Sequence, residues 1–429
     1  MENLSFDALV IGAGAAGLLA ALEIALTGRK VAVLEAKARP GGRIHSVEKN
    51  GRWLELGAEF VHGDLPVTKE LFKKARIKTV PVKGSVWQHK DGRLQEQADF
   101  IEDEDELEKK FQSLEKDKPV ARFLRDDLAG EHYSDLRFSL KNYVEGYYAA
   151  DTEKASTRAL CEELTSGEEE QYRVEGSYHR LVAYLENECR HRGVQFFFSS
   201  PVTQLQWKKG KAVAITETGT FAAARVLITV SIGVLKNAGI TFFPALPAVK
   251  KAVQQLGYGH VIKIVVQFDR SFWKERSITG GQDLSDLNFL FSTEAIPTWW
   301  THHPKKEAML VGWLGGPRAE QLQLLDKEEI TRKALESLTR IFSLDPAYLS
   351  KHCTGIEVYN WSADPHFCGA YAYEVVNGHD LIKTLQQPVE ETVFFAGEGL
   401  HPGPQIGTVE GALVSGRETA RLLIASFPA

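Results

Sequence analysis

Residues 6–43 read FDALVIGAGAAGLLAALEIALTGRKVAVLEAKARPGGR, and this stretch decides the fold of the chain. Its apolar run over residues 6–11 predicts a short buried strand. Three glycines follow at the G-x-G-x-x-G spacing: Gly12 permits a tight turn, Gly14 lets a pyrophosphate approach the backbone, and Gly17 lets the next helix pack closely on the strand. We therefore predict a strand–turn–helix unit whose helix N-terminus meets phosphate charge.

The same unit continues into a second strand. Residues 15–27 are apolar almost all round, as expected of a helix packed against a sheet, and Ala15 and Ala16 fall at its phosphate-facing start. Residues 30–34 predict a strand that ends at Glu35, where a carboxylate can accept hydrogen bonds from both ribose hydroxyls and would repel a 2′-phosphate. The unit predicts a dinucleotide but does not distinguish NAD from FAD.

The composition is that of an ordinary globular protein. The chain has 429 residues, 43% of them hydrophobic and 25% charged, which favours two interleaved domains with a large core. Its net charge of −6 and the lack of a basic tract argue against nucleic acid as a main partner. The cysteines lie far apart and form no C-x-x-C pair, so we expect reduced thiols and no metal site. They are Cys161, Cys189, Cys353 and Cys368.

The two ends of the sequence predict a soluble, cytoplasmic protein without a membrane partner. Asp7 and the first glycines interrupt what would have to be the hydrophobic core of a signal peptide. The last residues, LLIASFPA, form no hydrophobic tail long enough to span a bilayer.

Chemistry-bearing residues recur in four later segments. Residues 57–63, GAEFVHG, place Glu59 and His62 in a turn of small residues. The strand expected within YGHVIKIVVQFDRSFW, residues 258–273, carries the single charged residue Lys263 among apolar neighbours. Residues 361–373, WSADPHFCGAYAY, are rich in aromatic side chains, and FFAGEG at 394–399 precedes a closing helix.

These segments, in this order, resemble the flavin-dependent amine oxidases: the monoamine, polyamine and spermine oxidases and the flavin histone demethylases. VLEAKARPGGR resembles the family's LEA-x-x-R-x-GGR, GAEFVHG resembles the turn beside the flavin, and FFAGEG with GTVEGALVSG resembles the C-terminal flavin signature. The resemblance runs essentially end to end and is nearest, in its motifs, to the polyamine and spermine oxidases.

The resemblance implies an α/β fold. A Rossmann-like FAD-binding domain of the glutathione-reductase type is expected to be interleaved with an α+β substrate domain that has a mixed sheet and a helical insertion. The expected FAD-binding domain comprises residues 1–80, 173–252 and 364–429. The expected substrate domain comprises residues 81–172 and 253–363.

The resemblance also implies which residues hold FAD. Monoamine oxidases attach FAD through a cysteine that would fall at Ala370, so we expect a non-covalent cofactor here. No metal ligands are expected. The expected cofactor-binding residues are Gly12, Gly14, Ala15, Ala16, Gly17, Glu35, Ala36, Lys37, Gly42, Arg43, Gly57, Ala58, Glu59, Phe60, Val202, Trp361, Gly397, Glu398, Gly407, Thr408 and Val409.

Five residues are the catalytic candidates that the resemblance implies. Lys263 would hold a water against flavin N5, although a strand-edge lysine can also extend to solvent. Tyr371 would align an amine with its ring, and Thr408 falls where monoamine oxidases place the other wall of an aromatic cage. His62 could orient an amine or relay a proton, or be structural. Glu59 could recognise a substrate cation or bond the backbone.

The expected reaction is oxidation of the C–N bond of an amine to an imine, with O2 reduced to H2O2 and a polyamine-like substrate favoured. The partners are then a small amine and O2, and the protein is expected to be a monomer or a homodimer. An L-amino-acid oxidase is the alternative, but Glu59 replaces the arginine grip that such enzymes use. A desaturase, a protoporphyrinogen-oxidase-like enzyme and a non-enzymatic flavoprotein scaffold are further alternatives.

Overall fold

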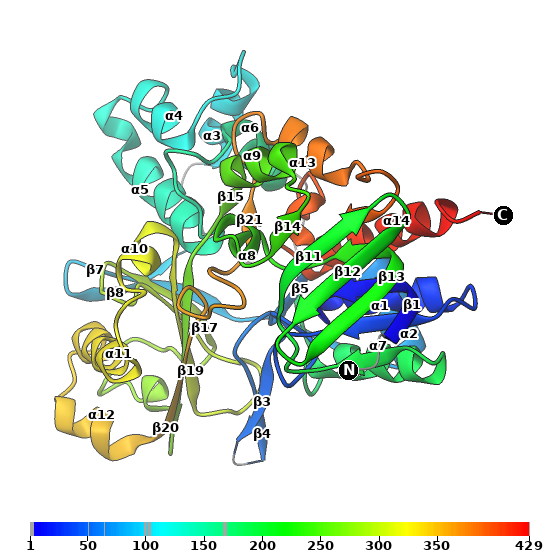
Figure 1. Ribbon diagram of the computed structural model, residues 1–429. Coiled ribbons are helices and arrows are strands. Elements are labelled where there is room, and N and C mark those ends of the chain that lie inside the picture. The colour runs from blue at the N-terminus through cyan, green and yellow to red at the C-terminus, as the bar shows by residue number, and fades with distance from the viewer. Residues whose placement is uncertain are drawn as a thin grey trace.

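Two large sheets, each with its own helices, organise the chain (Figure 1). The computed structural model describes residues 4–49, 51–63, 65–97, 101, 104–165 and 170–428. In Figure 1 the first sheet and the helices beside it lie on the right, the second sheet lies at the lower left, and a group of short helices lies at the upper left.

The first sheet contains the nucleotide unit and runs in the order β10-β2-β1-β13-β12-β11-β14, with β22 paired to β13. β1 is parallel to β2 and β13, and β13 is parallel to β22, whereas β12 is antiparallel to its neighbours. The expected strands at residues 6–11 and 30–34 are thereby confirmed. The strands are β1 (Leu4–Ile11), β2 (Val31–Leu34), β10 (Gln195–Phe197), β11 (Val202–Lys208), β12 (Lys211–Thr216), β13 (Gly219–Ile228), β14 (Thr241–Phe243) and β22 (Val393–Phe395).

Both faces of this sheet are buried. Ala8 and Val10 of β1 belong to one apolar cluster, while Leu9 and Ile11 belong to a second cluster on the opposite face, as the period of two along a strand requires. The first cluster includes α1 (Ala15–Ala25), α2 (Pro66–Ala75), α7 (His179–His191) and α14 (Val409–Ala425). The second is covered by α8 (Ile232–Lys236), α9 (Pro247–Gln255) and α13 (Gly378–Gln386).

One helix begins later than its sequence predicts. The segment after Val174 is expected to open as a helix at Gly176, but Val174 ends a strand and α7 begins at His179. Gly176 adopts φ +87°, a left-handed conformation that an α-helix cannot include. The expectation of a helix from Gly176 was therefore wrong by one turn.

The second sheet is mixed and runs in the order β20-β16-β19-β18-β17-β7-β8. The helices α10 (Gly316–Gln321), α11 (Lys327–Ile341) and α12 (Pro346–His352) accompany it, and α11 begins with a capping box between Asp326 and Glu329. The strands are β7 (Ser85–Lys90), β8 (Arg93–Gln97), β16 (Val261–Phe268), β17 (Leu287–Ser292), β18 (Thr298–Trp300), β19 (Met309–Gly315) and β20 (Cys353–Asn360).

Smaller elements join the two sheets. The hairpin β3 (Ser46–Lys49)–β4 (Arg52–Glu55) projects below the junction in Figure 1. A three-stranded sheet consists of β5 (Phe60–His62), β9 (Gln171–Val174) and β6 (Thr79–Pro81), in that order. A two-stranded sheet consists of β15 (Gly257–Tyr258) and β21 (Ala372–Tyr373). The helical group consists of α3 (Glu104–Gln112), α4 (Val120–Asp126), α5 (Ser134–Asn142), a π-helical turn (Tyr143–Tyr147) and α6 (Thr157–Leu164).

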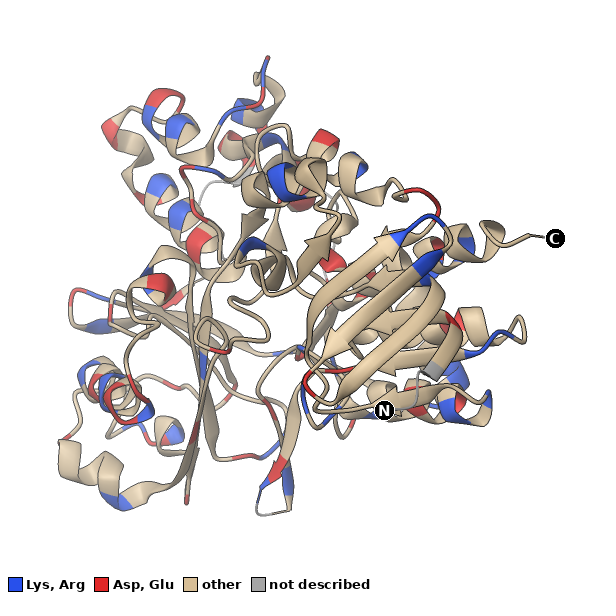
Figure 2. Ribbon diagram, viewed as in Figure 1, with Lys and Arg blue, Asp and Glu red and all other residues tan. Residues whose placement is uncertain are grey.

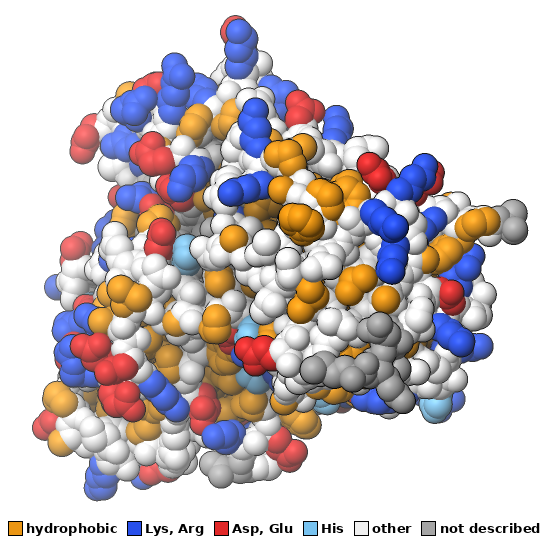
Figure 3. Space-filling model, in the orientation of Figure 1, with side chains coloured by type: hydrophobic (Ala, Val, Ile, Leu, Met, Phe, Trp, Pro, Cys, Tyr) orange, Lys and Arg blue, Asp and Glu red, His pale blue; other side chains and the backbone are white. Residues whose placement is uncertain are grey.

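Charged side chains of both signs are interspersed over the molecule. Figure 2 shows Lys and Arg next to Asp and Glu along the helices at the upper and lower left, and Figure 3 shows the same mixture on the surface of that face. None of the helices in the described part of the chain combines the length and the apolar character needed to cross a membrane. The four cysteines are free, and the described residues contain no group of three or more His, Cys, Asp or Glu placed to hold a metal.

Candidate active site

The turn between β1 and α1 leaves open space at one of its three glycines. A Cβ on Gly17 would lie 2.0 Å from the carbonyl oxygen of Gly12, and Gly12 itself adopts φ +107°. A Cβ on Gly14, by contrast, would meet no atom within 4 Å, although Gly14 directly precedes α1. This is the arrangement that a dinucleotide phosphate requires, because the ligand approaches the backbone where the helix N–H groups point.

Glu35 lies at the end of β2, beside this turn. Its Oε2 accepts a hydrogen bond from Ala13 N at 2.7 Å and its Oε1 accepts one from Lys37 N at 2.8 Å. Burial raises the pKa of Glu35, and the two backbone hydrogen bonds partly oppose that rise. Each carboxylate oxygen retains a further lone pair, so Glu35 can still accept from ribose hydroxyls.

The turns at 41–43 and 57–58 close over the nucleotide turn. Gly41 N donates to Ala13 O at 2.8 Å, and a Cβ on Gly42 would lie 3.2 Å from Gly14 Cα. Ala58 N donates to Arg43 O at 3.1 Å. The structure therefore brings together three glycine-containing turns that the sequence analysis had assigned to one cofactor.

Arg43, at the end of the 41–43 turn, forms an ion pair with Glu398. Arg43 Nη1 donates to Glu398 Oε1 and, at 2.6 Å, to Ala370 O, while Glu398 Oε2 accepts from Ala372 N at 3.2 Å. A small cavity runs from Arg43 along residues 228–232 and 395–400, at the carboxyl ends of the parallel strands β13 and β22. Ligands of open α/β sheets bind at this edge, and Gly397 leaves room there because a Cβ would meet nothing within 4 Å.

The remaining cofactor candidates take different positions. Lys37 Nζ is paired with Asp364 Oδ2 at 2.5 Å, and Trp361 Nε1 donates to Leu56 O at 2.9 Å. Thr408 caps α14, since its Oγ1 accepts from Gly411 N at 3.0 Å and donates to Gln405 O at 2.7 Å. Ala15 and Ala16 begin α1, Ala36 follows Glu35, Val202 begins β11 in the core, and Val409 begins α14.

Lys263 and Glu59 meet at the junction of the two sheets. Lys263 Nζ lies 2.7 Å from Glu59 Oε2 and donates to Gly57 O at 3.1 Å, and the side chain of Lys263 is only 1% exposed. The lysine therefore does not extend to solvent. Among the described residues, the hydrogen-bond partners of the Glu59 carboxylate are side chains.

Three further residues surround Glu59. Its Oε1 accepts from Arg173 Nε and from Trp300 Nε1, both at 2.9 Å, and lies 3.3 Å from His302 Nε2. Burial by itself would raise the pKa of Glu59, but the charge of Lys263, together with His302 and Arg173, holds it well below its ordinary value. Burial would lower the pKa of His302, but the carboxylates of Glu307 and Glu59 raise it.

An aromatic group lies next to this cluster. Tyr371 stacks on Trp313 with ring centroids 6.4 Å apart, and its hydroxyl donates to Tyr147 O at 2.5 Å. Burial raises the pKa of Tyr371, so the phenol keeps its proton. The hydroxyl of Tyr147 in turn lies 3.2 Å from His62 Nε2. Gly407 allows its backbone to approach the backbone next to Tyr371, since a Cβ on Gly407 would lie 2.6 Å from Ala372 O.

Five residues of this cluster were not predicted from the sequence: Arg173, Trp300, His302, Trp313 and Tyr147. Arg173 carried a usable signal, because a lone arginine in a short strand needs a buried partner just as Lys263 does. The aromatic residues carried none, since an aromatic side chain in a strand or helix is most often part of the core.

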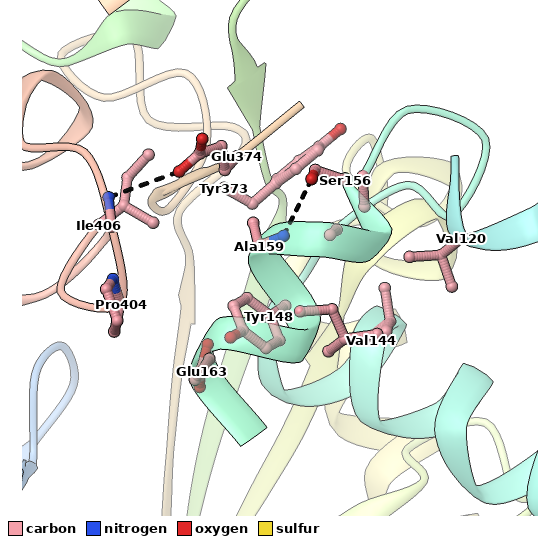
Figure 4. A pocket seen from close by; sticks show the side chains of 14 residues that line it. Val120, Val144, Tyr148, Ser156, Ala159, Glu163, Tyr373, Glu374, Pro404 and Ile406 are labelled. Carbon is pink, nitrogen blue, oxygen red and sulfur yellow. Dashed lines mark hydrogen bonds between the residues drawn. The ribbon is translucent and has the colours of Figure 1, made fainter. Parts of the chain in front are cut away.

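A second cavity lies between the helical group and residues 373–374 and 403–406. Figure 4 shows Tyr148 and Glu163 on the helical side, facing Glu374, Pro404 and Ile406. The hydroxyl of Tyr148 is buried without a hydrogen-bond partner in the described part of the chain. The wall of this cavity is otherwise largely apolar and includes Val120, Val144, Leu160 and Ile406.

Comparison with known proteins assigns the chain to a family. The family model described as flavin containing amine oxidoreductase matches residues 15–424. The chain belongs to the flavin-containing amine oxidoreductases. Membership makes FAD the cofactor of this chain, and the open space at Gly14 and the carboxylate of Glu35 fit FAD.

Individual relatives and structures of flavin-containing amine oxidoreductases agree with this assignment. Probable polyamine oxidase 4 of Arabidopsis thaliana is 28% identical and covers 97% of this chain and 86% of its own length. Lysine-specific histone demethylase 1 homolog 2 of Oryza sativa subsp. japonica is 27% identical over 99% of this chain, which spans only 58% of that relative.

The solved structures show the shared fold. Putrescine oxidase, as the wild type bound to putrescine, superposes with a TM-score of 0.78 at 20% identity, covering 99% of this chain and all of its own. Cyclohexylamine oxidase from Brevibacterium oxydans IH-35A gives a TM-score of 0.78 at 20% identity, covering 98% of this chain and 99% of its own. The expected fold, an FAD-binding α/β domain with a substrate domain, is confirmed.

Proposed function

We propose that this chain is an FAD-dependent oxidase that converts a polyamine-like amine to an imine, with O2 as electron acceptor and H2O2 as product. The observation that carries the proposal is the buried Lys263–Glu59 pair, which lies between the glycine turns of the cofactor site and the Tyr371–Trp313 aromatic pair. Bound FAD would supply the two-electron oxidation of the amine carbon. The residues of the chain bind the reactants, orient them and exclude water.

The proposed cofactor site is the set of turns around Gly14. Phosphate would be held by the start of α1, ribose by Glu35, and the remainder by the segments 41–43, 57–60, 397–398 and 407–409. The ammonium of Lys263 has one proton without an acceptor among the described residues, because Glu59 and the carbonyl of Gly57 accept the other two. We propose that this proton holds the water or the reacting group.

An amine fits the site better than an amino acid does. Lys263 and Arg173 are both paired with Glu59, so neither offers its charge to a substrate carboxylate. The cavity of Figure 4 instead carries the carboxylates of Glu163 and Glu374 on its wall, and Glu374 Oε1 lies 2.7 Å from His379 Nδ1. Carboxylates on an apolar wall suit a cationic alkyl chain, and the names of the relatives and of putrescine oxidase support a di- or polyamine.

FAD is proposed to be non-covalent. Ala370 stands where a cysteine would be needed, and Cys368 Sγ is directed to Pro365 O at 3.3 Å. Acid precipitation of the purified protein should release all flavin into the supernatant. Flavin that stays on the precipitated protein would contradict a non-covalent cofactor.

The domain boundaries proposed from the sequence, with residues 1–80, 173–252 and 364–429 on the FAD side, are supported by the division of the strands into two large sheets. A cytoplasmic location and a monomeric or homodimeric state complete the proposal.

A peroxide assay tests the proposed function. The purified holoprotein is incubated with putrescine, spermidine, spermine, an acetylated polyamine, a monoamine and L-amino acids. We expect H2O2 with di- and polyamines and none with amino acids. Activity confined to L-amino acids would overturn the proposal, and flavin reduction without H2O2 would overturn its O2 part.

A further inference from the structure

The ammonium of Lys263 is held in one orientation by the carboxylate of Glu59. Glu59 Oε2 accepts from Lys263 Nζ at 2.7 Å, and the carbonyl of Gly57 accepts a second proton at 3.1 Å. With two of three ammonium protons fixed, the direction of the third is fixed as well. Without Glu59 only one acceptor would remain, and the ammonium could rotate about its bond.

Glu59 is in turn held by two donors on other strands. Arg173 of β9 and Trp300 of β18 both donate to Oε1 at 2.9 Å, so the two oxygens of the carboxylate have separate tasks. Arg173 is itself fixed, because its Nη2 donates to Thr301 O at 3.1 Å and its guanidinium lies 4.7 Å from the centroid of the Phe60 ring. The carboxylate therefore cannot turn away from Lys263 without losing two hydrogen bonds.

Burial gives this arrangement a large energetic effect. The side chains of Lys263, Glu59 and Arg173 are 1%, 3% and 7% exposed. Removing one member of a buried ion pair is strongly destabilising, because the other charge stays buried without its partner. Loss of the Glu59 charge would remove the buried anion that Lys263 and Arg173 share.

We propose that Glu59 is the positioning residue of Lys263: its carboxylate directs the third ammonium proton of the lysine toward the reacting atoms, and Arg173 and Trp300 keep Glu59 in place. The inference deepens the proposed function and rests on it, since it assigns how Lys263 is prepared for its task. Glu59 acts through Lys263 and does not itself contact the substrate.

The test compares Glu59→Gln and Glu59→Asp with the wild type in anaerobic stopped-flow reduction by an amine and in reoxidation by O2, over a range of pH. Glu48→Gln is the control, because Glu48 is a carboxylate exposed on the surface of β3. We expect Glu59→Gln to slow one of the two half-reactions by about tenfold or more, with a shifted pH profile, and Glu59→Asp to restore part of the rate. Glu48→Gln should stay within about twofold of the wild type.

A double-mutant cycle separates positioning from a general structural effect. In the Lys263→Met background, Glu59→Gln should cause no further loss of rate, because its effect passes through the lysine. The charged groups around the pair that could contribute to the pH profile are Arg173, His302 with Glu307, and Glu55. A readout independent of turnover is the visible spectrum of the oxidised flavin, which should change with pH differently in Glu59→Gln and in the wild type.

Each outcome decides the inference. An unchanged rate, pH profile and spectrum in folded Glu59→Gln would overturn it, and so would additive losses in the double variant. If Glu59→Gln does not retain FAD, Trp300→Phe is compared with the wild type instead. This variant removes one hydrogen bond to Glu59 Oε1 and should slow the affected half-reaction several-fold. A wild type that oxidises no amine overturns the proposed function instead, so the two failures are distinct.

Discussion

Lys263 Nζ lies 2.7 Å from Glu59 Oε2, although 204 positions separate the two residues in the chain. The contact joins the second large sheet, through β16, to the turn that precedes β5 and packs on the cofactor segments. A charged pair at this depth is expensive to bury and persists only where its geometry is satisfied. Its place at the boundary between the proposed FAD and amine sites makes it the centre of the account.

Replacing Lys263 by methionine should abolish most of the activity. Lys263→Met keeps an unbranched side chain of similar length but offers no proton to a water or a reacting group, so we expect flavin reduction or reoxidation to slow by about 100-fold or more. Glu59 keeps Arg173 as a partner, and the protein should still fold and bind FAD. Stopped-flow absorbance measures both half-reactions, and wild-type rates in both would refute a catalytic role for Lys263.

The nucleotide turn predicts opposite effects for two neighbouring glycines. Gly14→Ala places its methyl group where no atom lies within 4 Å, so the stability of the apoprotein should change by less than about 0.5 kcal/mol. The Kd for FAD should nevertheless rise by about tenfold or more, because the methyl group occupies the space proposed for phosphate.

Gly17→Ala should destabilise the fold itself. Its Cβ would lie 2.0 Å from Gly12 O, and relieving this overlap should cost about 3 kcal/mol in the free energy of unfolding. Gly219→Ala is the control, since a Cβ there meets nothing within 4 Å and lies in β13. Urea unfolding and flavin-fluorescence titration separate the two effects; equal behaviour of Gly14→Ala and Gly219→Ala toward FAD would argue against the phosphate site.

His45 predicts how stability depends on pH. Burial lowers the pKa of His45 from 6.5 to about 4, with the nearby charges of Arg39 and Lys37 adding to the effect. Between these two values the unfolded chain binds more protons than the folded one, so stability is full above the upper value and declines as the pH falls toward the lower one.

The variant His45→Gln should lose less stability than the wild type when the pH falls from about 7.5 to about 5, because it has no imidazole to protonate. Urea unfolding at the two pH values measures this difference. His191→Gln, which changes an exposed histidine at the end of α7, should behave like the wild type. The same pH dependence in the wild type and in His45→Gln would contradict the assignment to His45.

Removing a carboxylate from the wall of the second cavity should affect the KM of polyamines more than that of monoamines. Glu163→Gln removes a charge from that wall, so KM for a di- or polyamine should rise by about threefold to tenfold while KM for a monoamine stays unchanged. Glu162→Gln is the matched control, because Glu162 is exposed on the same helix and does not line the cavity. Equal changes for both substrates would show that the cavity does not receive the distal charge.

Local sequence signals predicted the two strands and the helix of the nucleotide unit. The spacing of Gly12, Gly14 and Gly17 indicates a turn whose geometry depends on adjacent residues. The apolar patterns of β1 and α1 on either side show where in the chain that turn lies. Lys263 was recognisable because a single charge in an apolar strand must find a partner. The start of α7 at His179 could not be predicted from the sequence, since it depends on the conformation of Gly176 and on the pairing of β9 with β5 and β6.

The identity of partners across the fold could not be predicted. Arg173 lies 114 positions and Trp300 lies 241 positions from Glu59, and the sequence holds no local signal that they meet. Glu59 therefore remained ambiguous between substrate recognition and a backbone contact until the second sheet was in place. Contacts of this range are fixed by the packing of whole elements rather than by any one segment.

The most direct test of the account is anaerobic mixing of the purified flavoprotein with spermidine or putrescine, followed by the absorbance of the oxidised flavin. The account predicts that the oxidised-flavin band bleaches with either amine, returns when O2 is admitted, and is unaffected by L-amino acids. A band that persists with every amine, in protein that carries a full complement of FAD, would contradict amine oxidation at this site.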